Sequence, residues 1–225
     1  MTDEPVEEQR RREFDAVRSA LAAAGLPSAD FGRFVSNRHP GLISPAVFDY
    51  QGAVPVLLGM LPRVSHPHVL ESIVRSLSTR HARPVAAVPL ITLFKNTAGD
   101  SDLKWAIGNA LDVVTTSRHK EVVLEVALDQ NHGRSRQMVV ERLARISGDP
   151  RIVEAMHRLA MDPDVALHAQ AGLRRLLGND EALKFIRPLL GHESEGVRRG
   201  ATYNVKKLEE ALTRRARTQT RWPPV

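Results

Sequence analysis

The chain has 225 residues, of which 42% are hydrophobic and 26% are charged, a composition typical of a folded globular chain. It contains no cysteine, which excludes disulfides and thiolate metal sites. No segment approaches the roughly 20 consecutive apolar residues that a membrane span needs, and the charged N-terminal stretch lacks the apolar core of a signal peptide. We therefore expect a cytoplasmic protein that does not associate with membranes.

Charge is distributed unevenly along the sequence, which has a formal net charge of +6. Residues 1–15 carry six acids and three bases, whereas residues 196–225 carry eight bases and two acids. A basic end favours nucleic acid or an acidic partner, although a solvated helix end followed by a frayed tail gives the same pattern.

The first 45 residues are expected to form a charged capping helix and an irregular connector. Phe14, Val17 and Leu21 recur at helical spacing within residues 6–24, and Gly25 follows as a stop signal. Residues 26–45 are rich in Pro, Gly and Ser, and only a short helix around Phe31–Val35 is expected there.

A repeat of about 32 residues occupies residues 46–212. Five segments share one register, in which the fifth and the ninth positions are always apolar. These segments are VLESIVRSL (69–77), LKWAIGNAL (103–111), SRQMVVERL (135–143), VALHAQAGL (165–173) and VRRGATYNV (197–205). Apolar residues four apart form one face of an amphipathic helix, so each segment is predicted to be helical.

A more apolar segment precedes each of these helices. The five segments are residues 54–61, 88–94, 121–128, 151–160 and 181–190. Polar turns rich in Asp, Ser, His and Gly separate the two helices of each pair. Helix pairs of this size cannot bury their apolar faces alone and must stack. We therefore predict an all-α fold, a right-handed α-solenoid of about five antiparallel helix pairs with an N-terminal capping helix, followed by a mobile basic tail at residues 213–225.

The pattern of the second helices resembles that of HEAT repeats, in particular the short, lyase-like repeats common in bacteria. Leu103–Leu111, followed by His132-Gly133-Arg134 and Met138-Val139-Val140, is similar to one widespread bacterial group of such proteins. The resemblance covers residues 46–212. It implies the fold but no particular activity, because that group is functionally uncharacterised and HEAT arrays mostly serve as scaffolds for other macromolecules.

In a HEAT array the second helices line the concave surface, so their positions opposite the buried stripe are the candidate binding residues. The 100° step per residue places eight residues of interest there. They are Glu71, Arg75, Trp105, Asn109, Asp112, Arg199, Tyr203 and Lys206. Trp105 is the most specific of them, because an exposed aromatic buries much area with few rotatable bonds; it would alternatively fill a gap between repeats. The sequence thus predicts a non-enzymatic scaffold that engages an unidentified protein partner, with no cofactor and no small-molecule substrate.

Nucleic-acid binding is the alternative, with Arg198, Arg199, Lys206 and Lys207 as its residues. The mixed charges of the groove argue against it, because a surface that holds a phosphate backbone should be consistently basic.

The hypothesis that the chain is an enzyme has weaker support from the sequence than either binding function. Trp105, Asp112 and Arg136 superficially resemble the groove of HEAT-like alkylpurine DNA glycosylases, but their spacing departs from that family's motif. The nine histidines are scattered, and His66-x-His68 is expected to serve a turn rather than a metal. No metal site is predicted.

Overall fold

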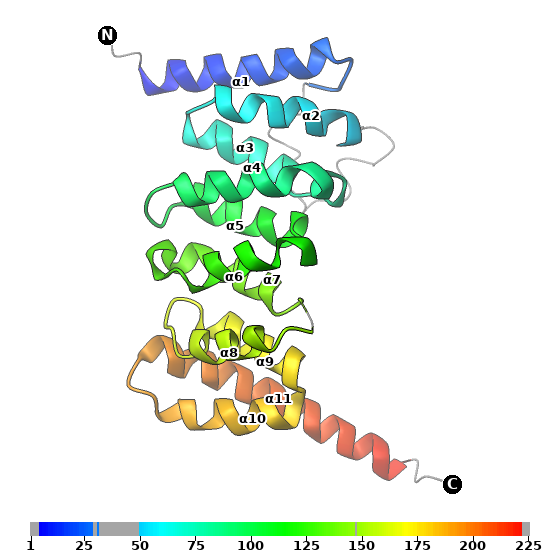
Figure 1. Cartoon of the computed structure of the whole chain (residues 1–225), viewed down its shortest axis with the longest axis vertical. Coiled ribbons are helices and arrows are strands. Elements are labelled where there is room, and N and C mark those ends of the chain that lie inside the picture. Colours follow the sequence, from blue (N-terminus) through cyan, green and yellow to red (C-terminus); the bar gives the residue numbers. More distant parts are fainter. Residues whose placement is uncertain (1–4, 29–30, 32–49, 147, 222–225) are drawn as a thin grey trace. The chain divides into compact units, whose positions relative to one another are not determined.

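The computed structural model describes residues 5–28, 31, 50–146 and 148–221, and every regular element in these ranges is a helix (Figure 1). The all-α prediction is therefore confirmed. Most of the connector expected at residues 26–45, together with Trp222, lies outside the described ranges. None of the described helices is long and apolar enough to cross a bilayer. Contacts between residues divide the chain into two compact units, Met1–Thr115 (unit 1) and Thr116–Val225 (unit 2).

Unit 1 begins with α1 (Val6–Ala23), which packs against α2 and α3. Val17 and Leu21 are fully buried, and the Phe14 ring lies 4.9 Å from that of Phe31. The carboxylate of Glu13, also buried, accepts hydrogen bonds from the backbone amides of Ser65 (3.1 Å) and His66 (2.8 Å), directly before α3. Glu13 therefore satisfies donors at the start of α3 that have no partner within that helix.

Two helix pairs complete unit 1. They are α2 (Tyr50–Met60) with α3 (Pro67–Leu77), and α4 (Arg83–Asn96) with α5 (Asp102–Val114). A 3-10 turn at Leu61–Arg63 joins α2 to α3, and another at Arg80–Ala82 lies between the two pairs. The partners in each pair are in contact, and so are α2 with α4 and α3 with α5. Pro67 opens α3, and the Ser101 hydroxyl accepts a hydrogen bond from the Lys104 amide (3.2 Å) to cap α5.

The first helices of unit 1 are apolar on all sides. The sequence of α2 contains no charged residue, and α4 has charged residues only near its ends. As a result Val88 of α4 is 65% exposed and Val85 is 53% exposed. This leaves an uncharged outer surface on α4.

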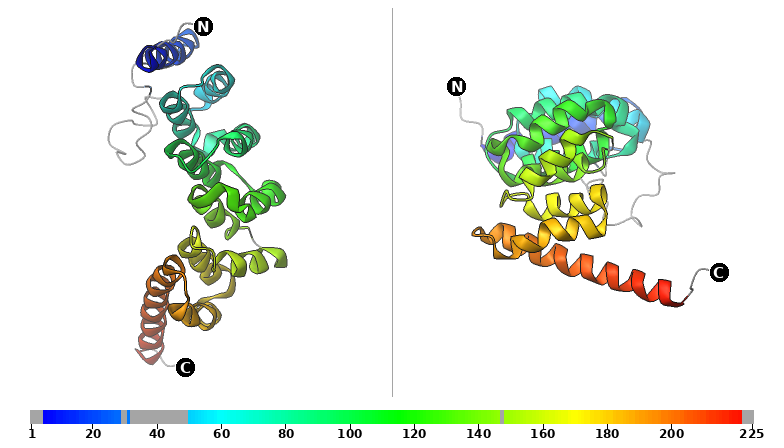
Figure 2. Two further views of the ribbon diagram at one scale, coloured as in Figure 1. Left: turned by 90° about the vertical axis from the view of Figure 1, so that its left-hand side faces the viewer. Right: turned by 60° about the horizontal axis from the view of Figure 1, so that its bottom comes forward.

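Unit 2 contains three helix pairs. They are α6 (Lys120–Leu128) with α7 (Gln137–Leu143), α8 (Pro150–Leu159) with α9 (Ala166–Leu177), and α10 (Asn179–Ile186) with α11 (Glu195–Arg221). Further 3-10 turns lie at Ser117–His119, Gln130–Arg136 and Arg187–Gly191. Again the partners in each pair are in contact, and α7, α9 and α11 form one layer while α6 contacts α8 (Figure 2).

Small residues on α9 and α11 let neighbouring helices approach closely. A Cβ at Gly172 would lie 2.2 Å from Met156 Cε and 2.7 Å from Ala144 Cβ. A Cβ at Gly200 would lie 3.1 Å from the backbone nitrogen of Leu167. Packing between helices therefore leaves no room for a Cβ at Gly172 and little room for one at Gly200.

Arg136 is a fully buried charged residue that joins the third and fourth helix pairs. Its Nε donates to the Gly133 carbonyl (3.0 Å) and its Nη1 to the Ala127 carbonyl (2.9 Å). Its Nη2 donates to Asp162 Oδ2 (2.6 Å), in the turn between α8 and α9. The guanidinium thus connects the end of α6 to the next helix pair. Each of its three nitrogens donates a hydrogen bond, which compensates for the burial of the charge.

Helix α11 extends farther than the sequence predicts. It continues to Arg221 and runs past the end of α10, into the segment from Thr213 onward that we expected to be a tail (Figure 1). Its inner face buries Val205 and Leu208, and Arg187 forms an ion pair with Glu209 (2.7 Å). Arg, Ala and Gln in the extension are compatible with helix even without an apolar stripe. The mobility of this segment stays a prediction.

Candidate functional site

Three of the predicted groove residues meet on the adjacent helices α3 and α5. Arg75 Nε donates to Glu71 Oε1 at 2.7 Å, one helical turn away. The guanidinium carbon of Arg75 lies 6.0 Å from the centroid of the Trp105 ring, which is within the range of a cation–π contact. Trp105 itself is 39% exposed. Glu71, Arg75 and Trp105 therefore form a cluster, here called the tryptophan cluster, with an exposed aromatic side chain beside an ion pair.

The register of α5 explains why Trp105 is exposed. Ala106, Ile107 and Ala110 are buried, so Trp105 lies on the other side of the helix. Asn109, one turn further on, donates from Nδ2 to the Trp105 carbonyl (2.8 Å), and Asp112 is half-buried in the last turns of α5. Asn109 and Asp112 extend a polar surface along α5 next to the tryptophan cluster.

The other predicted residues belong to unit 2. Arg199, Tyr203 and Lys206 are exposed on one face of α11, and Tyr203 is 55% exposed with Lys207 Nζ 5.8 Å from its ring centroid. Leu167 of α9 is also 42% exposed. Since these residues and the tryptophan cluster lie in separate units, one continuous groove that contains all of them stays a prediction.

Arg198 has a structural role that the sequence analysis missed. Its Nη1 donates to the carbonyls of His192 (2.7 Å) and Glu193 (2.6 Å). The side chain thereby folds back on the turn that precedes α11. Arg198 is consequently a poor candidate for the phosphate contact that its position in the sequence suggested.

The glycosylase-like arrangement is overturned by the burial of Arg136. Its guanidinium is held by two carbonyls and Asp162 and has no exposed surface, so it cannot reach a nucleotide. Arg136 therefore stabilises the packing of repeats and does not complete a site with Trp105 and Asp112.

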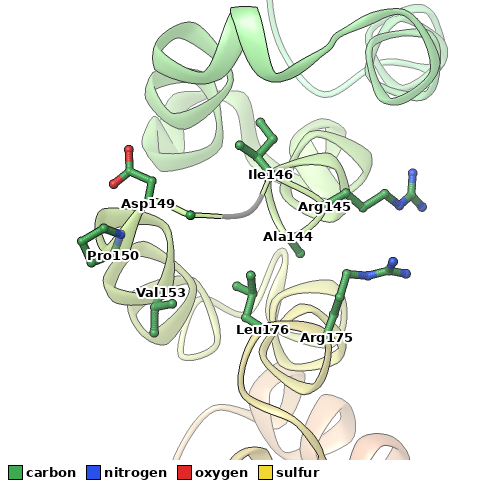
Figure 3. Close-up of a pocket in the computed structure, with 9 residues that line it drawn as sticks. Ala144, Arg145, Ile146, Asp149, Pro150, Val153, Arg175 and Leu176 are labelled. Atoms are coloured by element: carbon green, nitrogen blue, oxygen red, sulfur yellow. The ribbon is translucent and has the colours of Figure 1, made fainter.

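Unit 2 also contains an open pocket of about 390 Å³ between the ends of α7 and α9 and the start of α8 (Figure 3). Arg145 and Arg175 extend on the same side of it, and Asp149 lies on the other. The Asp149 carboxylate pairs with Arg151 (2.7 Å) and Lys120 (2.8 Å), and these hydrogen bonds hold its pKa well below the usual range. Arg145 is likewise paired, with Glu141 (3.0 Å), so both signs of charge at the pocket are compensated around a lining that includes Ile146.

The histidines form no metal centre in the part of the chain that the structure describes, where no group of three His, Asp or Glu side chains gathers. His66 is buried at the start of α3, with its ring 5.7 Å from that of His68. His132 lies 3.5 Å from Asp129 in the turn between α6 and α7.

Comparison with known proteins found no matching protein family, no matching curated protein and no matching solved structure.

Proposed function

We propose that this chain is a non-enzymatic binding scaffold, and that the tryptophan cluster of Glu71, Arg75 and Trp105 is where it engages a protein partner. The observation that carries the proposal is the 39% exposure of Trp105 beside the Arg75–Glu71 ion pair. Tryptophan and arginine are the residues most often found to dominate binding energy at protein interfaces.

The cluster is pre-organised for binding. Glu71 restrains the Arg75 side chain, and Arg75 in turn covers part of the Trp105 ring, so little side-chain freedom is left to be lost on association. The ring offers apolar area, while the guanidinium retains N–H groups for an acidic group. We expect the partner segment to insert an apolar side chain against Trp105 and to place a carboxylate near Arg75.

We further propose that the five helix pairs form one right-handed, HEAT-type α-solenoid, which would expose the second helices of both units on a common concave face. The repeated contacts within each unit support this, because each helix contacts its pair partner and most also contact the equivalent helix of the neighbouring pair, as α3 does with α5 and α7 and α11 do with α9. Small-angle X-ray scattering tests it: an extended array gives an elongated distance distribution, and a compact one contradicts the proposal.

The protein-binding proposal is tested by selecting peptides from a random display library on the full chain and measuring their affinities by calorimetry. Trp105→Ala should weaken binding at least about 30-fold, corresponding to a hot spot of ~2 kcal/mol. The matched control is Val88→Ala, which removes exposed apolar area of α4 within the same unit and should leave the affinity unchanged.

Two results would contradict this function. Peptides that bind Trp105→Ala as well as the wild type, but lose affinity with Val88→Ala, would move the interface to the apolar surface of α4. A library that yields no peptide with micromolar affinity would leave the tryptophan cluster without a protein-binding role.

A further inference from the structure

The net positive charge of the chain resides in unit 2. Residues 1–115 contain 12 basic and 12 acidic side chains, whereas residues 116–225 contain 20 and 14. An excess of charge confined to one unit raises the local concentration of anions near it.

The exposed face of α11 presents a row of bases. Arg199, Lys206, Arg214 and Arg217 are all exposed, and the 100° step per residue places them within roughly 80° of one another around the helix. The opposite face of the helix is buried and includes Ala201 and Leu208. At 1.5 Å per residue the row extends over about 27 Å. We call these four side chains the basic row.

Further charged side chains of α11 also have partners within the fold. Arg198 caps the preceding turn, and Arg215 lies 3.9 Å from Asp180 of α10. Glu209 pairs with Arg187, on the side of the helix next to the basic row. Glu210 is the one acid on the face itself between Arg199 and Arg217, and Lys207 lies 4.0 Å from it. On this face the four bases of the basic row therefore outnumber the single acid.

The chemistry of this face distinguishes among macromolecular partners. Tyr203, 55% exposed, is a large hydrophobic side chain on this face, whereas between Lys206 and Arg217 the exposed residues of the face are polar, such as Thr213. A single tyrosine supplies little of the apolar core that protein interfaces usually have. A phosphate backbone needs only regularly spaced cations and hydrogen-bond donors.

The size of α11 also suits a duplex. The major groove of B-DNA is about 12 Å wide and admits one α-helix. The C-terminal turns of α11 continue past α10, which leaves much of the circumference there uncovered (Figures 1 and 2). We propose that α11 binds the phosphate backbone of duplex nucleic acid through Arg199, Lys206, Arg214 and Arg217, without sequence specificity.

The test is fluorescence anisotropy of a labelled 20-base-pair duplex with the full chain at several NaCl concentrations. Four phosphate contacts predict that affinity falls about 150-fold between 50 and 200 mM salt. Arg214→Gln/Arg217→Gln should reduce that fall to about 12-fold and weaken binding at 50 mM by more than tenfold. Arg118→Gln/Arg134→Gln removes two exposed bases elsewhere in unit 2 and should change binding far less.

Three outcomes would overturn the proposal. These are no binding at 50 mM NaCl, equal losses in the two double variants, and polyglutamate that competes as well as unlabelled duplex at equal charge. The last would assign α11 to an acidic protein segment. Trp105→Ala should leave duplex binding unchanged, so this proposal and that for the tryptophan cluster fail independently.

Discussion

Replacement of Arg136 by methionine is expected to destabilise unit 2 by about 3–5 kcal/mol. The substitution keeps much of the side-chain volume but removes three hydrogen bonds, to the carbonyls of Ala127 and Gly133 and to Asp162. Breaking one side of a buried ion pair leaves the other charge without compensation, and losses of this size are typical. Asp162→Asn should cost less, because its side-chain oxygen still accepts from the arginine.

Urea denaturation followed by circular dichroism measures the loss, and hydrogen exchange locates it. Amides of α6 to α9 should lose protection in Arg136→Met, since the guanidinium joins these two helix pairs. The control is Arg158→Met on α8, whose exposed side chain pairs with Glu154 on the same helix, so its loss should leave stability almost unchanged. A loss below ~1 kcal/mol in Arg136→Met, or equal losses in both variants, would refute the assignment of Arg136 as the link between repeats.

Three other substitutions test packing and pH dependence. Gly172→Ala should destabilise the chain by about 1–2 kcal/mol, because the new Cβ would meet Met156 and Ala144. Gly59→Ala in α2, where a Cβ meets nothing within 4 Å, should instead stabilise the chain by up to ~1 kcal/mol. Thermal unfolding measures both effects, and a change of stability in the same direction in the two variants would contradict this account of the packing. Burial alone would raise the pKa of Glu13, but hydrogen bonds from Gln9, the His66 amide and Ser65 lower it below its ordinary value of 4.5. The stability contributed by Glu13 is therefore fully present above pH 4.5 and is lost as pH falls through the lowered pKa of the folded state. Glu13→Gln should cost about 1 kcal/mol at pH 7 and flatten acid denaturation below pH 4.5, and an unchanged acid limb in urea titrations would count against this role.

The helices could be predicted because their burial follows a 3.6-residue period. Ile107 and Leu111, for example, are buried where the repeat register places them, and Trp105 is exposed on the other side. The sequence does not reveal contacts between distant residues. Glu13 caps a helix that begins more than 50 positions later, and nothing in its local pattern distinguishes it from the solvated acids around it.

Charged residues are where local patterns fail most clearly. Hydrophobic periodicity assigns any arginine to the surface, yet Arg136 is buried because backbone carbonyls and Asp162 satisfy its donors. Arg198 and Arg199 are adjacent and chemically identical, but only Arg198 turns back to the carbonyls before α11. Charge counts from the sequence thus include side chains that are already engaged within the fold.

The two proposed surfaces differ in chemistry in a way that makes their responses to salt separable. The tryptophan cluster relies on apolar area and a locally paired arginine in a unit with equal numbers of acids and bases. Binding there should depend weakly on ionic strength, because little net counterion release accompanies it. Binding to the basic row must weaken steeply with salt. If both proposals hold, the chain would be an adaptor that keeps its protein partner at salt concentrations where it has already released nucleic acid.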